Sequence, residues 1–103
     1  MLAQNTKFGL QNKEVEIIQN YLKTIPELSK VVIFGSRARG DFKEFSDIDL
    51  CLFSKAKLDV FTIKNELNQL RIPFLFDVLQ WENLDNLKLK NKIEVEGKPF
   101  WEK

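Results

Sequence analysis

The sequence predicts a single α/β domain over residues 1–103, in which helices cover a small mixed β-sheet. Short apolar runs alternate with segments whose apolar residues recur every three or four positions, as they do in an α/β layer. The 44% hydrophobic residues, among them nine Phe, are sufficient for a core. Neither a repeat nor a linker interrupts the chain, so we expect one domain.

The individual elements follow from periodicity and from capping residues. The expected elements are a helix capped by Asn12 and ending before Pro26, a strand at 31–34, a one-turn helix capped by Ser36, a strand at 48–53, a helix capped by Asp59, a strand at 74–79 and a helix at 83–95. The strand at 31–34 is apolar throughout, which predicts burial on both faces.

The composition limits the chemistry that the protein can perform. The sequence has no His and a single Cys, which excludes His-based zinc sites, Ser/His/Asp triads, Cys/His dyads and disulfides. Any catalysis therefore depends on carboxylates. The net charge of +1 gives no general attraction for duplex nucleic acid, and no stretch is apolar enough to span a membrane. We expect a cytoplasmic protein that binds neither.

The first candidate site is the segment 35–40, with the sequence GSRARG, which directly follows a predicted strand. Gly35 allows a phosphate to approach the backbone, and Ser36 offers a hydroxyl and an amide at the start of a short helix. Arg37 and Arg39 add positive charge nearby. The segment lacks the Lys-Ser/Thr of a P-loop. The alternative interpretation is a strand-to-helix turn with two solvated arginines.

The second candidate is a pair of aspartates, Asp47 and Asp49, at alternate positions of a predicted strand. Side chains two apart on a strand point to the same face, so the two carboxylates lie side by side and repel each other. Mg²⁺ would relieve this repulsion because it prefers carboxylates, water and phosphate oxygens as ligands. The alternative is that residues 46–47 cap a turn and Asp49 is an exposed strand residue.

The third candidate is Asp77, the only polar residue in the predicted strand at 74–79. A buried charge without a partner would cost several kcal/mol, so we expect a cation beside it. That cation is either Arg71 or another surface base, or a metal shared with Asp47 and Asp49. Two metals held by such acids can clamp the attacking and leaving oxygens of a phosphoryl transfer.

These residues together form a composite pattern. A strand, the GS pair at 35–36, ten residues, the DID triplet at 47–49 and a later strand with Asp77 resemble the nucleotidyltransferase core of the DNA polymerase β superfamily. The likeness is greatest to the minimal nucleotidyltransferases of bacteria and archaea, in which GSRARG is followed by SDIDL. It departs at 98–101, where Lys-Pro-Phe-Trp replaces an aliphatic strand and leaves the final strand open.

The resemblance implies a role for each candidate. Gly35 and Ser36 would bind the β and γ phosphates of ATP, and Arg39, with Arg37 as a weaker match, would contact a phosphate or the partner. Asp47, Asp49 and Asp77 would be the ligands of Mg²⁺, with two ions expected. Asp77 would also act as the base toward the incoming hydroxyl.

The resemblance also implies a partner. Minimal nucleotidyltransferases occur with all-helical proteins of the HEPN or substrate-binding type, as antitoxin and toxin, and add AMP from ATP to a tyrosine of the partner. Two alternatives remain open: a small-molecule acceptor, as for aminoglycoside nucleotidyltransferases, and a non-catalytic antitoxin that acts by binding. Trp81, Phe100 and Trp101 are expected either to dock this partner or a second copy of the chain, or to close the core.

Overall fold

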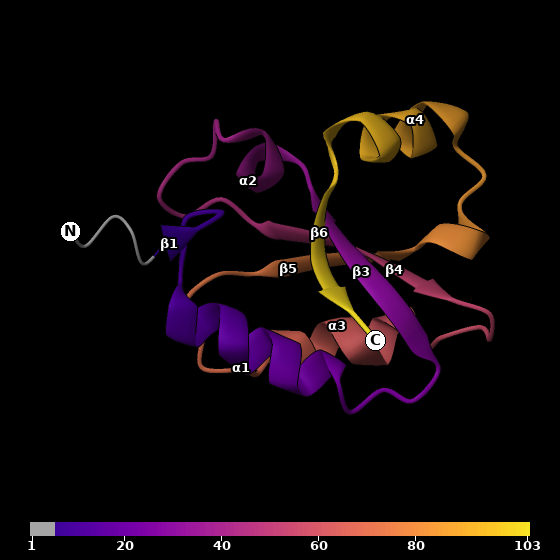
Figure 1. Ribbon diagram of the computed structural model, residues 1–103, viewed down its shortest axis with the longest axis horizontal. Helices are drawn as coiled ribbons and strands as arrows, with labels where there is room; N and C mark the ends of the chain where they lie inside the picture. Colours follow the sequence, from indigo (N-terminus) through magenta and orange to yellow (C-terminus); the bar gives the residue numbers. More distant parts are fainter. Residues whose placement is uncertain (1–5) are drawn as a thin grey trace.

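The computed structural model describes residues 6–103 as a four-stranded mixed sheet with helices on both faces and a two-stranded hairpin (Figure 1). The elements are β1 (Thr6–Lys7), β2 (Leu10–Gln11), α1 (Asn12–Leu22), β3 (Leu28–Phe34), α2 (Ser36–Arg39), β4 (Ile48–Ser54), α3 (Val60–Asn68), β5 (Phe76–Gln80), the 3₁₀ turn η2 (Trp81–Asn83), α4 (Leu87–Glu96) and β6 (Lys98–Glu102). The predicted fold class is confirmed. None of the described helices is long and apolar enough to cross a membrane.

The strand order of the sheet is β5-β4-β3-β6. The central strand β3 is antiparallel to both β4 and β6, whereas β4 and β5 are parallel and are joined through α3. Parallel neighbours begin at the same edge of a sheet, and Asp49 of β4 therefore lies directly opposite Asp77 of β5. The end of β3 reaches the same edge, because Phe34 pairs with Asp49.

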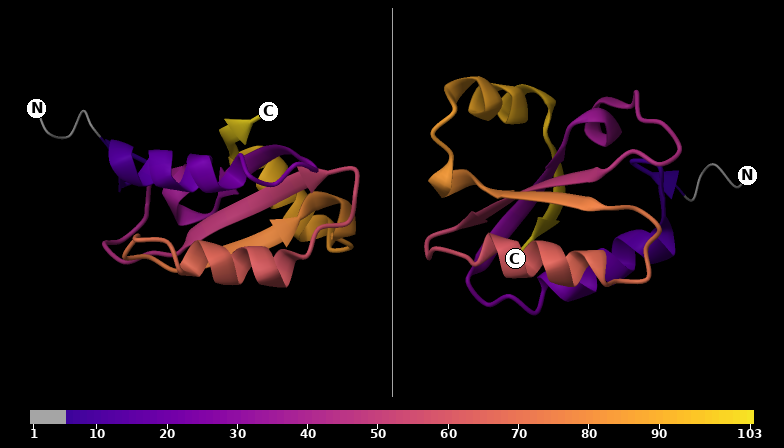
Figure 2. Two further views of the ribbon diagram at one scale, coloured as in Figure 1. Left: turned by 90° about the horizontal axis from the view of Figure 1, so that it is seen from below. Right: turned by 180° about the vertical axis from the view of Figure 1, so that it is seen from behind.

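One face of the sheet is covered by α1 and α3, which lie below it in Figure 1 and side by side in Figure 2. The two helices contact each other, since the Tyr21 hydroxyl donates a hydrogen bond of 2.6 Å to Oε1 of Glu66. Seventeen buried apolar residues form the core on this side, and Ile18, Leu50 and Leu67 among them are fully inaccessible. Apolar burial on this face supplies most of the stabilisation.

The opposite face carries α2 and α4, which lie above the sheet in Figure 1. Its apolar cluster has three buried residues, Phe34, Cys51 and Ile93, packed with half-buried neighbours from the strands β3, β4 and β5 and from η2, α4 and the segment between them. Cys51 is a free, buried thiol. This face is thinly covered, and the end near α2 is left for polar side chains.

The start of the helix agrees with the prediction in α3 and differs in α1, in α4 and in the single turn of α2. Asp59 caps α3 as predicted, because its Oδ1 accepts from the amide of Thr62 at 3.1 Å. Asn12 is the first residue of α1 rather than its cap; Gln11 precedes the helix and donates its amide to Glu14. The last helix begins at Leu87, since Asn86 caps it and residue 83 belongs to η2.

The strands are also longer or displaced relative to the prediction. β3 begins at Leu28, because that buried side chain extends the pairing with β4 past an irregularity at residues 28–30. The final strand, left open by the sequence, is present as β6 and pairs with β3. It tolerates Pro99 because β6 is an edge strand, where a missing amide disrupts no second neighbour.

Candidate active site

Gly35 joins the end of β3 to the single turn of α2. Its φ of 76° lies in a region that L-residues avoid, and a side chain at this position would overlap Oδ2 of Asp49. Its carbonyl accepts from the amides of Ala38 and Arg39, at 3.1 and 3.0 Å, and so forms the turn. Gly35 itself is the cap. The prediction that Ser36 caps this helix is wrong: Ser36 is its first residue and no side-chain cap forms.

The three predicted acids lie at one edge of the sheet, beside this turn. Asp47 precedes β4 by one residue, and Asp49 and Asp77 are each the second residue of their strand. Ile48 and Leu50 belong to the core under α1 and α3, so Asp49, between them on the strand, points to the opposite face. Asp77 pairs with Asp49 in register and shares that face.

The electrostatics of Asp49 show how close these charges are. Its pKa is raised from 3.8 to about 6 by burial first, then by repulsion from Asp77 and from Asp47. Arg39 and Arg37 oppose the shift without cancelling it. The neighbouring acids therefore repel the charge of Asp49 more strongly than the two arginines attract it. Within the described residues, however, no group of three or more acid, His or Cys side chains is arranged to hold a metal ion by itself.

Asp77 differs from the prediction in its environment. It is exposed, with 60% of its side chain accessible, because β5 is an edge strand and nothing covers this end of it. Its Oδ1 lies 3.7 Å from Nζ of Lys64 in α3, which is the other surface base that the sequence left open beside Arg71. The buried charge that the apolar neighbours of Asp77 predicted is thus absent. An exposed pair of this kind contributes little to stability, and the carboxylate is accessible to a substrate.

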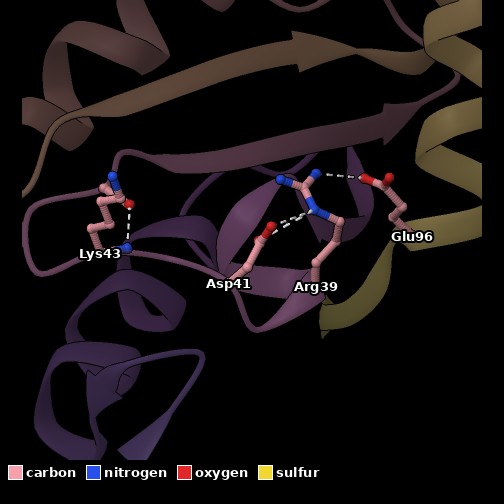
Figure 3. Close-up of polar contacts among 5 residues, drawn as sticks. Arg39, Asp41, Lys43 and Glu96 are labelled. Atoms are coloured by element: carbon pink, nitrogen blue, oxygen red, sulfur yellow. Dashed lines mark hydrogen bonds and ion pairs between the residues drawn. The ribbon is translucent and has the colours of Figure 1, made fainter.

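Arg39 lies on the exposed side of α2, between two acids (Figure 3). Its Nε is 3.2 Å from Asp41, and its Nη1 is 3.0 Å from Oε1 of Glu96 at the end of α4. These ion pairs raise the pKa of the guanidinium and connect α2 to α4. Arg39 also attracts the charge of Asp49. It is the better placed of the two arginines to meet a phosphate.

Arg37 is placed quite differently from the prediction, because only 2% of the residue is exposed. Each of its three nitrogens donates to a backbone carbonyl: Nε and Nη2 to Ser46, and Nη1 to Phe8. Burial lowers the pKa of the guanidinium from its ordinary value. Its position does not support the predicted contact with a nucleotide phosphate.

A cavity of about 460 Å³ lies apart from these residues, between β6, α4 and η2. Trp81 and Trp101 line it and are half-buried, whereas none of the seven predicted site residues does. Phe100 is 5% exposed and belongs to the main core. Of the three aromatic residues considered for an interface, Phe100 therefore closes the core, and the two tryptophans remain partly accessible.

Several contacts of the site had no signal in the sequence. Glu96 is 57 positions from Arg39, and Lys64 reaches Asp77 from a different helix. The carbonyls of Ser46 and Phe8 carry no side-chain information at all. Only the tertiary structure brings these groups to the site.

Comparison with known proteins identifies the family. Residues 16–103 match the family described as Polymerase beta, Nucleotidyltransferase. The chain belongs to this family. As a nucleotidyltransferase it acts on a nucleotide substrate, and the Gly35 turn with its neighbouring acids occupies the matched region.

Two curated relatives of this nucleotidyltransferase carry related names. A probable protein adenylyltransferase, MntA of Haemophilus influenzae, is 29% identical over 78 residues, which cover 73% of this chain and 68% of the relative. A putative protein adenylyltransferase of Methanocaldococcus jannaschii is 41% identical over 46 residues, covering 40% of this chain and 46% of the relative.

Solved structures show the same fold. A toxin–antitoxin structure with AMP-PNP superposes with a TM-score of 0.73 at 24% identity, covering 87% of this chain and 73% of the other. The complex of a tri-AMPylated Shewanella oneidensis HEPN toxin with its MNT antitoxin has a TM-score of 0.66 at 21% identity, covering 100% and 74%. A putative nucleotidyltransferase from Sulfolobus solfataricus has a TM-score of 0.55 at 29% identity, covering 86% and 77%.

Proposed function

We propose that this nucleotidyltransferase transfers AMP from ATP to a hydroxyl of a partner protein, as the antitoxin of a toxin–antitoxin pair with an all-helical, HEPN-type toxin. The observation that carries the proposal is the meeting of Gly35 with Asp49 and Asp77 at one sheet edge. The relatives named protein adenylyltransferases and the neighbour with an AMPylated toxin support this choice of substrate and acceptor. A cytoplasmic location belongs to the same proposal.

The nucleotide phosphates would bind at the turn between β3 and α2. Gly35 leaves the backbone open to close approach, and Ser36 offers its amide and its hydroxyl at the start of α2. Arg39 would turn from Asp41 and Glu96 toward the β and γ phosphates, because a triphosphate carries more charge than either carboxylate. The nucleotide would thus exchange partners with an existing ion pair.

The acids fit a hard divalent cation such as Mg²⁺. All three donors are carboxylates, and the raised pKa of Asp49 reflects repulsion that a cation would relieve. Asp47 and Asp49 would hold it, with Asp77 completing a second position, and phosphate oxygens would supply the ligands that the protein does not arrange by itself. When bound, two such cations supply charge stabilisation to the attacking and leaving oxygens.

The chemical step is a displacement at the α phosphorus. The acceptor oxygen forms a bond to that phosphorus, the bond to the oxygen bridging to the β phosphate breaks, and pyrophosphate leaves. The hydroxyl proton passes to Asp77, which is exposed enough to meet an acceptor from outside. Lys64, 3.7 Å from Oδ1, lies beside the base and helps to keep its carboxylate oriented.

The test is transfer to the protein encoded beside this chain. We would incubate both proteins with Mg²⁺ and ATP labelled at the α phosphate, with ATP labelled at the γ phosphate as a control, and locate the label by mass spectrometry. Label from the α position alone, on a hydroxyl side chain of the partner, is the expected result. Asp49→Asn should abolish it.

The remaining alternatives are distinct outcomes of this experiment. Label that appears on an aminoglycoside or another small molecule, and not on the partner, contradicts the protein acceptor. Tight binding to the partner without any transfer contradicts catalysis and leaves an antitoxin that acts by binding. Sedimentation of the isolated chain tests for a homo-oligomer in the same samples.

A further inference from the structure

The guanidinium of Arg37 lies over two aromatic rings. Its guanidinium carbon lies 4.3 Å from the ring centre of Phe74 and 5.2 Å from that of Phe42. An arginine in this position is held by its flat faces, while its edges remain for hydrogen bonds. Ring contacts and hydrogen bonds together therefore fix the position of the guanidinium.

The hydrogen bonds of Arg37 join segments that are distant in sequence. Nε and Nη2 both donate to the carbonyl of Ser46, at 3.0 and 2.9 Å, and Nη1 donates to the carbonyl of Phe8 at 3.0 Å. The guanidinium suits this arrangement because its donors have a rigid geometry that a lysine lacks.

Arg37 and two of its contacts, Ser46 and Phe74, lie close in sequence to site residues. Arg37 follows Gly35 by two residues on α2, and Ser46 is covalently joined to Asp47. Phe74 precedes Asp77 by three residues, at the entry to β5. One buried side chain thus contacts the segments that carry the phosphate turn, the first acid and the third acid.

The loop before β4 needs such a support. Residues 41–47 contain no helix or strand, and Asp47 itself is exposed. Besides a short turn between Lys43 and Ser46 and the exposed ion pair of Asp41 with Arg39, the loop is held through the carbonyl of Ser46 by Arg37. A loop with few contacts of its own samples several conformations unless a packed group fixes it.

The hairpin of β1 and β2 closes the other side of Arg37. Its two-residue turn has Phe8 at φ 58° and Gly9 at φ 74°, both left-handed, as in the tight turns that favour hairpins. A Cβ at Gly9 would overlap the ring of Phe42 and Nη1 of Arg37. The hairpin precedes residues 16–103, the region that matches the family.

We propose that Arg37 is a positioning residue, which fixes Asp47 for metal binding by holding Ser46, with the hairpin turn at 8–9 as its cover. The role in metal binding rests on the proposed function. Arg37 acts from behind the site and does not touch the nucleotide.

The test is Arg37→Lys, which keeps the charge but replaces three donor nitrogens by one. We expect the dissociation constant for Mn²⁺, measured by EPR with a non-hydrolysable ATP analogue, to rise about tenfold or more, because small displacements of a ligand are costly. kcat should fall more than KM for ATP rises, and amide exchange of residues 41–47 should accelerate.

Two controls separate positioning from general destabilisation. Ile63→Val weakens the core beneath α3, and Arg71→Lys makes the same exchange at an exposed site. Both should leave the Mn²⁺ affinity and kcat unchanged. If Arg37→Lys lowers only the melting temperature, as Ile63→Val does, the positioning role is contradicted.

Gly9→Ala provides a second variant if Arg37→Lys does not fold. It displaces Arg37 from the hairpin side and should change the Mn²⁺ affinity and amide exchange in the same direction but less. A folded Gly9→Ala protein that binds Mn²⁺ as the wild type does overturns the proposal. Because these binding measurements need no acceptor, a wild type that binds Mn²⁺ and nucleotide but transfers no AMP refutes the proposed function alone.

Discussion

The two faces of the sheet differ in how they are covered. The face under α1 and α3 buries seventeen apolar residues in one cluster, whereas the face under α4 buries three. The acids and the turn at Gly35 belong to the thinly covered face. A nucleotide needs exposed carboxylates and open backbone, and these are incompatible with close apolar packing.

The strands of the sheet support the packed core and position the site residues at once. Along β4, Ile48, Leu50 and Leu52 anchor the strand in the core, so Asp49, between the first two, is held rigidly although it lies on the opposite face. Asp49 is therefore positioned by packing that it does not share.

Asp49→Asn should abolish AMP transfer without lowering the stability that the packed face of the sheet provides. The change removes a metal ligand, and the loss of several kcal/mol of charge stabilisation corresponds to roughly a 10³-fold lower rate. The melting temperature without metal should not fall, because repulsion from Asp77 and Asp47 is relieved. Rate and melt are measured on one preparation. Full activity in this variant would contradict the metal assignment.

Asp77→Asn should lower kcat by about 10²-fold while ATP binding largely survives, because a general base contacts the attacking hydroxyl and not the triphosphate. Calorimetric titration with the ATP analogue and Mg²⁺ gives the affinity, and single-turnover transfer gives the rate. If the affinity falls in proportion to the rate, Asp77 acts only as a ligand.

Leu52→Ala and Leu79→Ala make the same deletion on opposite faces. Leu52 is fully buried in the main core, and its truncation should cost about 2–5 kcal/mol of the free energy of unfolding. Leu79 is half-buried in the smaller cluster and should cost about 1 kcal/mol. Urea unfolding measures both. Equal losses would show that the two faces stabilise the fold equally.

The stability of the metal-free protein should fall as pH rises through about 6. The folded state holds the proton of Asp49 more tightly than the unfolded state, so its favourable contribution is complete below pH 3.8 and is lost above the raised pKa. Since the carboxyl is partly solvated, we expect a change of about 1 kcal/mol. Melts in EDTA from pH 4 to 8 measure it. The pH dependence of stability should disappear in Asp49→Asn and persist in the control variant Asp85→Asn. If it persists in Asp49→Asn, its assignment to Asp49 is contradicted.

Most of the fold and the acid cluster follow from local sequence. The alternation around Asp49 and the cap at Asp59 are local signals, and the structure bears out the strand and helix that they predicted. The position of Asp77 was predicted on its strand, but its exposure depends on which strand forms the edge of the sheet. The residues next to Asp77 in the sequence do not indicate which strand forms the edge.

The two arginines of α2 show where sequence reasoning ends. Arg37 and Arg39 are two positions apart in one motif and have the same chemistry, yet one is buried and the other exposed. The difference comes from Phe42, Phe74 and the hairpin, which are brought together only by the fold. A single sequence contains no pattern that assigns the two roles.

The most direct test of the account is the location of the bound nucleotide. We would add Mn²⁺ with a non-hydrolysable ATP analogue to isotopically labelled protein and follow the paramagnetic broadening of backbone NMR signals. We expect the strongest broadening at 35–36, 47–49 and 77, and weaker broadening at Trp81 and Trp101, which line the cavity between β6, α4 and η2. Broadening centred on the two tryptophans, or none at the acids, would contradict the account.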